Sequence, residues 1–376
     1  MSQTYTKLTG TGGLFPAIAD AIRGKTGGTE QIKADDFPTE ITNIPTGGGG
    51  GHVIPSDLPN DGKTRICYVI PEGSTGGMLT IKLVYHHDSG LGSTTVDWGD
   101  NSEATVSTGL NKIELTHTFE EAGEYIVSIT ASDIVWYFGG SATEHIYGGN
   151  TTKYTGYYIK WIVLGSGMEK IAISGLSELI NLQEIKMPAT GITELKNGCL
   201  SNAKALTEIE IPSSVTTIEG NVFSGCGFRS LTIPQTVTSL EGTNTINSCG
   251  QLEEITIPTA ITTLGEAFFT GCAKLQEINL PQGLTAIPTS CFSSCGNLRT
   301  ITIPAAVTTI GNYAFSGCVL LHKIKFLPTT PPTISNSNAF SNLPAGCVIS
   351  VPTGSLSAYT SAQNYPSSST YTYIEE

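Results

Sequence analysis

The sequence predicts a mainly β protein with a small helical N-terminal module, a β-sandwich, and a solenoid that ends in a C-terminal cap. Three observations support this fold class. A unit of about 23 residues recurs through the C-terminal half, and repeats of this length are typical of solenoids. Short alternating strands occupy the middle of the chain, and five glycines at 47–51 set the segment 1–46 apart. We therefore expect the divisions 1–46 (module), 47–58 (linker), 59–165 (sandwich), 166–328 (solenoid) and 329–376 (cap).

The composition indicates a folded, turn-rich protein. Charged residues make up 14% of the 376 residues, against roughly 25% in typical soluble domains. The net charge of −13 argues against a nucleic-acid partner, because phosphate binding needs clustered Lys and Arg side chains. No run approaches the roughly 18 apolar residues that span a bilayer, so we expect no membrane insertion. The segment 1–20 carries a single Lys and no continuous apolar run before Ala17, so we expect no secretion signal and folding in a cytoplasm.

Two short helices are expected in the N-terminal module. Apolar side chains recur one turn apart between positions 14 and 22, and Pro16 suits a first helical turn. A second helix is expected around 38–43, with Asp36 as its cap. Because so short a segment seldom folds alone, we expect it to gain its core by docking on a partner or on copies of itself. Its predicted docking residues are Leu14, Phe15, Ile18, Ile22, Phe37 and Ile41.

Residues 63–132 form short alternating runs divided by Gly, Asn and Asp, a pattern typical of a β-sandwich. The expected strands have the sequences RICYVIP, MLTIKLVYHH, TTVDWGD, KIELTHTF and EYIVSITAS. Asp97 and Asp100 lie at a predicted turn. We expect them to be structural turn carboxylates, with a calcium site as the alternative.

The stretch between the sandwich and the repeats is the most aromatic part of the chain. Two interpretations remain open. The rings either pack the end of the sandwich against the first coil, or form a ligand-binding surface for glycans or proteins. The candidate ligand-binding residues are Trp136, Tyr137, Phe138, Tyr147, Tyr154, Tyr157, Tyr158 and Trp161.

Prolines mark the repeat of the C-terminal half. Each follows an apolar residue at the end of a predicted strand, where the missing N–H is tolerated. Seven prolines follow one another at nearly equal steps along the chain: Pro188, Pro212, Pro234, Pro258, Pro281, Pro304 and Pro328. One coil cannot bury its inward residues alone, so the coils must stack, with strands about 4.8 Å apart. Six or seven coils would form a rod roughly 30 Å long.

Cysteines follow the same period. Five of the nine recur at one constant step, which indicates one repeated structural position and not a set of disulfides: Cys226, Cys249, Cys272, Cys295 and Cys318. No paired CxxC motif occurs, so zinc is not expected. We expect reduced thiols that fill a tight inner corner of each coil. After Cys226 the repeat is one residue short near Phe228, which predicts a local bulge.

Catalytic motifs are absent from the sequence. The six histidines show no ligand spacing such as HExxH, and no GxSxG elbow, P-loop or GxGxxG before a helix occurs. We therefore expect no enzymatic activity, no metal and no cofactor.

Three segments resemble known families. The motif IPxxVTTIxxxAFxGCxxLxxIxIP across 187–328 resembles the BspA-like class of bacterial surface-antigen leucine-rich repeats, and CVISVPTGSLSAYTSAQNYP at 347–366 resembles its closing strand and short helix. That resemblance implies adhesion and binding of protein or glycan. Residues 96–100, 117–119 and 123–127 are similar to a PKD (polycystic kidney disease) domain, a spacer or adhesion module whose tryptophan packs the core, although Asn101 replaces its usual glycine. LFPAIADAIRGKTGGTEQIKADDFPTEITNI resembles an N-terminal element of structural proteins of tailed bacteriophages.

These resemblances lead to three functional hypotheses. The first is a virion-displayed adhesin or fibre-like protein of a tailed phage, assembled in the host cytoplasm and exposed on the exterior of the particle. Residues 1–46 would then bind other virion structural proteins, and the solenoid would contact a host cell-surface protein or glycan. The alternative is a bacterial cell-surface leucine-rich-repeat adhesin, and the third is an intracellular scaffold.

Overall fold

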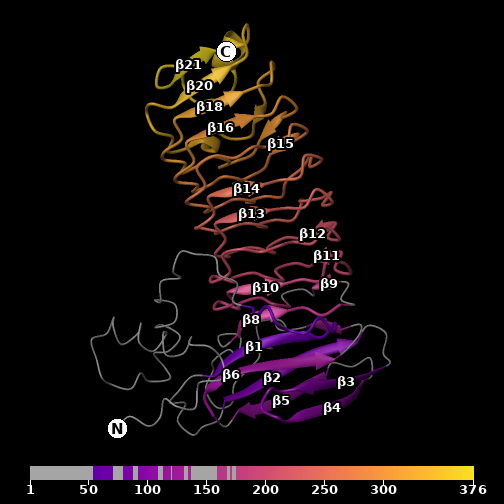
Figure 1. The fold of residues 1–376 in the computed structure, drawn as a ribbon. Helices are drawn as coiled ribbons and strands as arrows, with labels where there is room; N and C mark the ends of the chain where they lie inside the picture. Colours follow the sequence, from indigo (N-terminus) through magenta and orange to yellow (C-terminus); the bar gives the residue numbers. More distant parts are fainter. Residues whose placement is uncertain are drawn as a thin grey trace, which may run out of the picture.

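The computed structural model describes residues 54–70, 79–87, 92–108, 113–119, 121–130, 134–136, 159–166, 170–171 and 175–376. The predicted helical module of 1–46 and the glycine run at 47–51 lie outside these residues. The described part is mainly β, as the sequence predicts. A sandwich lies at one end, and a long stack of coils extends from it to the C-terminus (Figure 1).

The sandwich has two sheets, with the orders β10-β8-β1-β6-β3-β4 and β5-β2-β7. β1 lies inside the first sheet, paired with β6 on one side and β8 on the other, and six of its seven residues are buried. Trp98 and Phe119 contribute rings to the core between the sheets. Seven of these nine strands precede the solenoid: β1 (Thr64–Ile70), β2 (Leu79–His87), β3 (Gly92–Asp97), β4 (Glu103–Thr108), β5 (Ile113–Phe119), β6 (Gly123–Thr130) and β7 (Ile134–Trp136).

One strand, β8 (Ile159–Val163), joins the sandwich to the solenoid. It pairs antiparallel with β1 and parallel with β10 (Glu184–Lys186), the first long strand of the coils. An ion pair of 2.6 Å between Lys160 and Glu124 also ties β8 to β6. The buried residues of both parts consequently form one continuous hydrophobic core. A single strand both ends the sandwich and caps the first coil.

Parallel strands stack along two faces of the solenoid (Figure 1). Each residue pairs with its equivalent one coil later, as Ile301 does with Ile324 and Ile287 with Ile310. One face holds β9 (Lys170–Ile171), β11 (Glu194–Leu195), β12 (Thr217–Ile218), β15 (Ala286–Ile287), β17 (Thr309–Ile310) and β19 (Thr333–Ile334). The other continues from β10 through β13 (Ser230–Thr232), β14 (Glu254–Thr256), β16 (Thr300–Ile303), β18 (Lys323–Phe326) and β20 (Val348–Val351).

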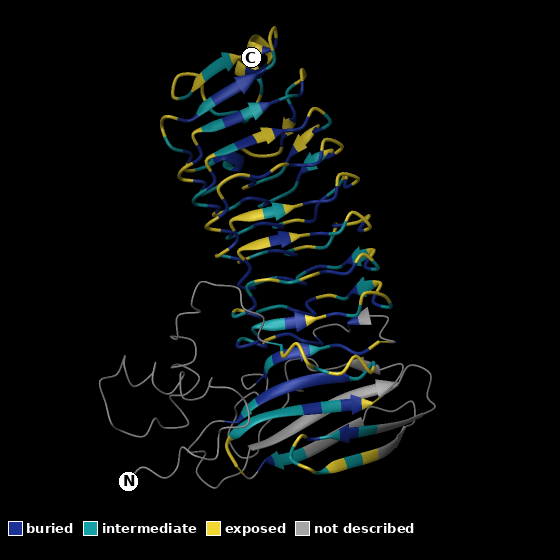
Figure 2. Cartoon of the chain, in the orientation of Figure 1, coloured by how far each residue is buried: buried dark blue, intermediate teal, exposed yellow. Residues whose placement is uncertain are grey.

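Turns form the third side of each coil, and one buried phenylalanine per turn forms a column: Phe223, Phe269, Phe292 and Phe315. Backbone N–H groups donate to carbonyls of the next coil, as from Phe269 to Cys291 at 2.9 Å and from Phe292 to Ala314 at 2.8 Å. The coil interior is buried along the whole stack, and exposed residues are confined to turns and outward strand positions (Figure 2). A further repeat feature is a non-glycine residue with φ of 53–56° at Asn221, Asn244, Ala267, Ser290 and Tyr313.

The short repeat after Cys226 is accommodated differently from the prediction. β13 pairs with β14 without a register shift, so no bulge forms in this pair. The turn instead tightens at Gly227, where any side chain would overlap the carbonyl oxygen of Lys204. Phe228 fills the leucine position and packs edge-on against Phe223, with ring centroids 5.6 Å apart.

The C-terminal cap contains the predicted closing strand β20 and short helix α3 (Leu356–Ser361), after the 3₁₀ helix η3 (Ser337–Phe340). The buried Tyr359 of α3 donates its hydroxyl hydrogen to the Pro328 carbonyl at 2.7 Å. A further strand, β21 (Thr372–Glu375), pairs parallel with β20 and was not expected from the sequence. The cap thereby covers the apolar end of the last coil, which would otherwise be open to solvent.

Candidate binding surfaces

The predicted docking and aromatic residues fall mostly outside the described structure. This holds for the docking set Leu14, Phe15, Ile18, Ile22, Phe37 and Ile41, and for Tyr137, Phe138, Tyr147, Tyr154, Tyr157 and Tyr158. Trp136 is the last residue of β7. Trp161 lies in β8 with 2% of its surface exposed. A ring buried to this degree packs the junction and offers no ligand contact, which agrees with the packing interpretation for this residue.

The Asp97–Asp100 turn is held by its own hydrogen bonds. Asp97 accepts from the Gly99 backbone N–H at 2.9 Å, and Asp100 accepts from the backbone and hydroxyl of Ser102. The other Asp100 oxygen lies 2.7 Å from His117 Nε2. Asn101 adopts a φ of 71°, the left-handed conformation that glycine usually supplies.

These contacts favour the interpretation of Asp97 and Asp100 as turn carboxylates, and the calcium alternative stays a prediction. Burial raises the pKa of Asp100, but hydrogen bonds from Ser102 and His117 outweigh it, and the net pKa is lowered. The carboxylate is thus satisfied by protein donors. Among the described residues, no group of His, Cys, Asp and Glu side chains could hold a metal ion. The geometry is that of a structural turn.

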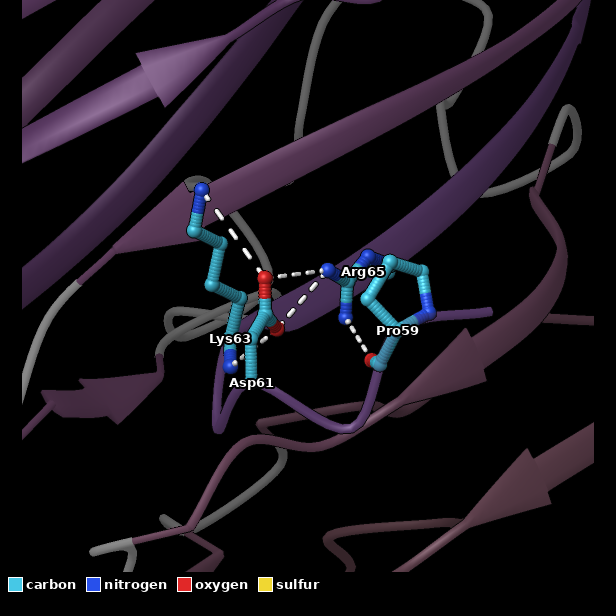
Figure 3. Close-up of polar contacts among 4 residues, drawn as sticks. All are labelled: Pro59, Asp61, Lys63 and Arg65. Carbon is cyan, nitrogen blue, oxygen red and sulfur yellow. Dashed lines mark hydrogen bonds and ion pairs between the residues drawn. The ribbon is translucent and has the colours of Figure 1, made fainter. Parts of the chain in front are cut away.

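A second polar cluster lies where the chain enters β1 (Figure 3). The buried Arg65 guanidinium donates to both carboxylate oxygens of Asp61, at 2.7 and 2.8 Å, and to the Pro59 carbonyl at 3.0 Å. The hydrogen bond from Arg65 lowers the pKa of Asp61. Beside this cluster, the Gly165 N–H donates to the Thr64 hydroxyl at 2.9 Å.

The cysteine column is buried and chemically shielded. All nine cysteines are free and buried. In five coils the thiol donates to a carbonyl of the preceding coil, as from Cys249 to Phe223 at 3.0 Å and from Cys318 to Phe292 at 3.1 Å. Burial raises the pKa of Cys249 and of Cys318 to about 12. Reactive thiolates are therefore scarce at neutral pH, because the thiolate is the nucleophile and these thiols stay protonated.

Two exposed faces of the solenoid repeat from coil to coil. The threonine face presents one exposed Thr per coil in six consecutive coils: Thr193, Thr216, Thr238, Thr262, Thr285 and Thr308. Backbone N–H groups link neighbours along this column, as from Thr308 to Thr285 at 2.9 Å, and the Thr308 hydroxyl donates to the same carbonyl at 3.3 Å. A hydroxyl that donates in this way keeps acceptor lone pairs for a ligand.

The strand face lies on the other sheet and is more acidic. Apart from Lys186 of β10, its exposed outward side chains are short or negatively charged: Glu208, Glu210, Ser230, Thr232, Glu254, Thr256, Glu277, Asn279 and Thr302. Residues 175–277 contain eleven Glu and five Lys or Arg residues in total, so these coils are acidic. Sequence patterning located the inward residues of these strands but assigned no role to the outward ones. No helix in the described part of the chain has the length and apolar character of a membrane span.

Comparison with known proteins agrees with this architecture. The model of the BspA type leucine rich repeat region matches residues 150–249 and 242–354, with six copies, and so covers more than half of the chain. A leucine-rich repeat protein from Bacteroides ovatus is 20% identical, with 77% of each chain covered and a TM-score of 0.45. A leucine rich cell surface protein from Faecalibacterium prausnitzii is 24% identical over 54% of this chain and 62% of that one, with a TM-score of 0.36. The pneumococcal vaccine antigen PcpA is 17% identical over 58% of this chain and 68% of that one, with a TM-score of 0.38. No curated protein matched the sequence.

Proposed function

Because the chain belongs to the BspA-type leucine-rich-repeat family, we propose that it is a non-enzymatic, adhesin-like binding protein whose solenoid is the contact surface. One observation carries the proposal. Exposed side chains of the same kind recur on successive coils, on a backbone that forms one continuous core with the sandwich.

Such columns suit the binding of a large partner. Threonine, serine and asparagine lose little side-chain entropy when a ligand immobilises them, and they both donate and accept hydrogen bonds. A standard interface buries about 800 Å² on each partner, which requires an extended surface and not a single pocket. Stacked coils supply that surface because every coil adds an equivalent strip.

The setting of this protein is also a proposal. Family membership favours the bacterial cell-surface alternative over the phage-virion hypothesis. The virion hypothesis rests on the resemblance of residues 1–46, which lie outside the described structure. A pulldown of phage structural proteins with a 1–46 peptide tests it: capture of a tail, portal or capsid protein would restore that hypothesis.

Binding by the solenoid can be tested with two matched variants. T238E/T262E/T308E places three carboxylates on the threonine face, and T232E/T256E/T302E places three on the strand face. Both sets are exposed and lie on corresponding coils. Binding of the fluorescently labelled chain to cultured epithelial cells is measured by flow cytometry. We expect one variant to weaken binding at least tenfold and the other to leave it unchanged, which would also identify the binding face. The absence of binding by the parent chain, or equal binding by all three proteins, would refute the proposal.

A further inference from the structure

The exposed large hydrophobic side chains of the described structure all lie near its C-terminal end. They are Tyr313, Val319, Leu320 and Leu356, with 42%, 53%, 47% and 36% of their surface exposed. Single exposed apolar residues are ordinary on protein surfaces. Here three of the four belong to one coil, and two of these are adjacent in sequence. We call Tyr313, Val319 and Leu320 the apolar coil surface.

The repeat itself shows that the fold does not require these residues. Val319 and Leu320 follow Cys318 in the turn of their coil. At the same two positions after the cysteine, the preceding coils have Gly296-Asn297, Ala273-Lys274 and Gly250-Gln251. These residues are small or polar, and their coils close in the same way. Closure of the coil therefore does not require an apolar pair at these two positions.

Tyr313 departs from its column in the same coil. It has a φ of 55°, at a position where the other coils have Asn221, Asn244, Ala267 and Ser290. Left-handed backbone is easy for asparagine but unfavourable for a bulky residue. Its hydroxyl accepts from the Asn338 side chain at 3.3 Å, while its ring remains exposed. A strained and exposed aromatic ring is more consistent with a contact residue than with a packing residue.

Charge distinguishes this end from the rest of the chain. The segment 278–376 contains three Lys or Arg and two Glu, a net charge of +1, so the segment 1–277 carries −14 and the whole chain −13. Both Glu residues are at the terminus, and Glu376 pairs within the chain with Lys323 at 2.7 Å and with Lys325 at 3.4 Å. The apolar coil surface thus lies on a nearly uncharged part of an acidic protein.

We propose that this surface binds a second copy of the chain, with the apolar coil surfaces of two copies packed against each other about a two-fold axis. A two-fold interface must be complementary to itself, and an uncharged apolar patch meets that requirement. The acidic coils of two copies repel each other, so the segment 278–376 is where they can approach. Depletion of charge together with an exposed tyrosine is also the composition that distinguishes the core of an interface.

Sedimentation velocity of the full chain tests the proposal. Between about 1 and 100 µM we expect the mass to rise from 39.5 kDa toward twice that value. V319A/L320K, which copies the Ala273-Lys274 pair, should weaken association at least tenfold. The control A273S/K274R substitutes both residues of the equivalent turn of an acidic coil without changing its charge, and should leave association unchanged. Raising NaCl from about 50 to 500 mM should strengthen association of the parent chain, because salt screens the repulsion between the acidic coils.

Three results would overturn the proposal: a monomer at every concentration, association that V319A/L320K leaves unaltered, or association that salt weakens. The second result would instead favour self-association through residues 1–46. Far-UV circular dichroism checks that each variant folds. If V319A/L320K does not, Y313N provides an independent test, since asparagine occupies the same backbone conformation at 221 and 244. It should also weaken association several-fold.

Discussion

Replacing Phe292 with alanine removes an inner ring from a stack of four that crosses successive coils. The rings of Phe269 and Phe292 are 5.3 Å apart and 12° from parallel, and those of Phe292 and Phe315 are 5.6 Å apart and 4° from parallel. Phe340 ends the stack, 5.5 Å from Phe315. Phe292 is fully buried, whereas 6% of Phe340 is exposed. The second ring neighbour of Phe340 is Tyr365, which is tilted by 35° at a centroid distance of 6.3 Å. The two positions therefore differ mainly in the number of parallel neighbouring rings and in depth.

The expected loss of stability follows from these differences. Truncation of a buried Phe to Ala costs about 3–5 kcal/mol, including the cavity that remains. With two stacked neighbours and no exposure, F292A should lie near the upper end, at about 4–5 kcal/mol. F340A has one parallel neighbour and can be partly filled by solvent, so about 3 kcal/mol is expected. In a solenoid the inner truncation also weakens the coupling of coils on both sides.

Urea unfolding followed by circular dichroism measures both losses by linear extrapolation. F292A should unfold at a lower urea concentration than F340A, and both should unfold below the parent chain. A loss below about 2 kcal/mol for F292A, or a larger loss for F340A, would refute the view that the ring stack is a main source of coil-to-coil stability.

Three further predictions concern the thiols, the close approach of coils and the junction. Burial raises the pKa of Cys249 and Cys318 from 9.0 to about 12, so these thiols stabilise the fold fully below pH 9 and this stability is lost as the pH rises toward 12. Thermal melts should show a loss of about 1.4 kcal/mol per pH unit for each such thiol above pH 9, and a flat profile to pH 11 would contradict this. G265A should lower the free energy of unfolding in urea by about 1–3 kcal/mol, because its methyl group would overlap the Gly242 carbonyl. The control G283A introduces only ordinary contacts and should be nearly neutral. Equal effects of the two substitutions would count against the close packing of coils. W161A should raise hydrogen exchange in both β1 and β10, since β8 pairs with each, and a change confined to one of them would argue against a shared sheet.

The solenoid was predictable from the sequence because every coil meets the same packing requirement. Pro258, Pro281 and Pro304 mark strand ends at a nearly fixed spacing, and the residues before them alternate inward and outward. The cysteine column follows from the same logic, since only a small side chain fits that corner, and the structure confirms that Cys272 and Cys295 are buried and reduced. The closing strand and helix of the cap were likewise evident from residues 347–366.

The junction could not be predicted in the same way. The β-branched and aromatic residues of 159–163 favour a strand, but this preference does not specify which strands lie on either side. Pairing with β1 joins segments that are far apart in the chain, and no local signal records it. The parallel addition of β21 to β20 is a non-local pairing of the same kind. Phe228 shows a third limit, because a missing residue can be absorbed by a tighter turn at Gly227 as well as by a bulge.

The candidate binding surfaces were harder still to predict from the sequence. Large aromatic residues suggested a ligand site, yet Trp161 is part of the core. The outward threonines match no sequence motif, and they form a continuous surface only when the coils stack in register. The apolar coil surface is found by comparing Val319 and Leu320 with their equivalents in neighbouring coils, a comparison that depends on knowing which residues are exposed.

Proteolytic shaving of intact cells that produce the chain tests the central claim, display of a solenoid as a contact surface, most directly. Trypsin is added to washed, unbroken cells, and released peptides are identified by mass spectrometry, with a cytoplasmic enzyme as the control for lysis. The account predicts release of peptides from exposed turns of the solenoid, such as those that end at Arg229 or Arg299, before any peptide of the control appears. Release of these peptides only after lysis, together with the control, would contradict display and favour an intracellular scaffold.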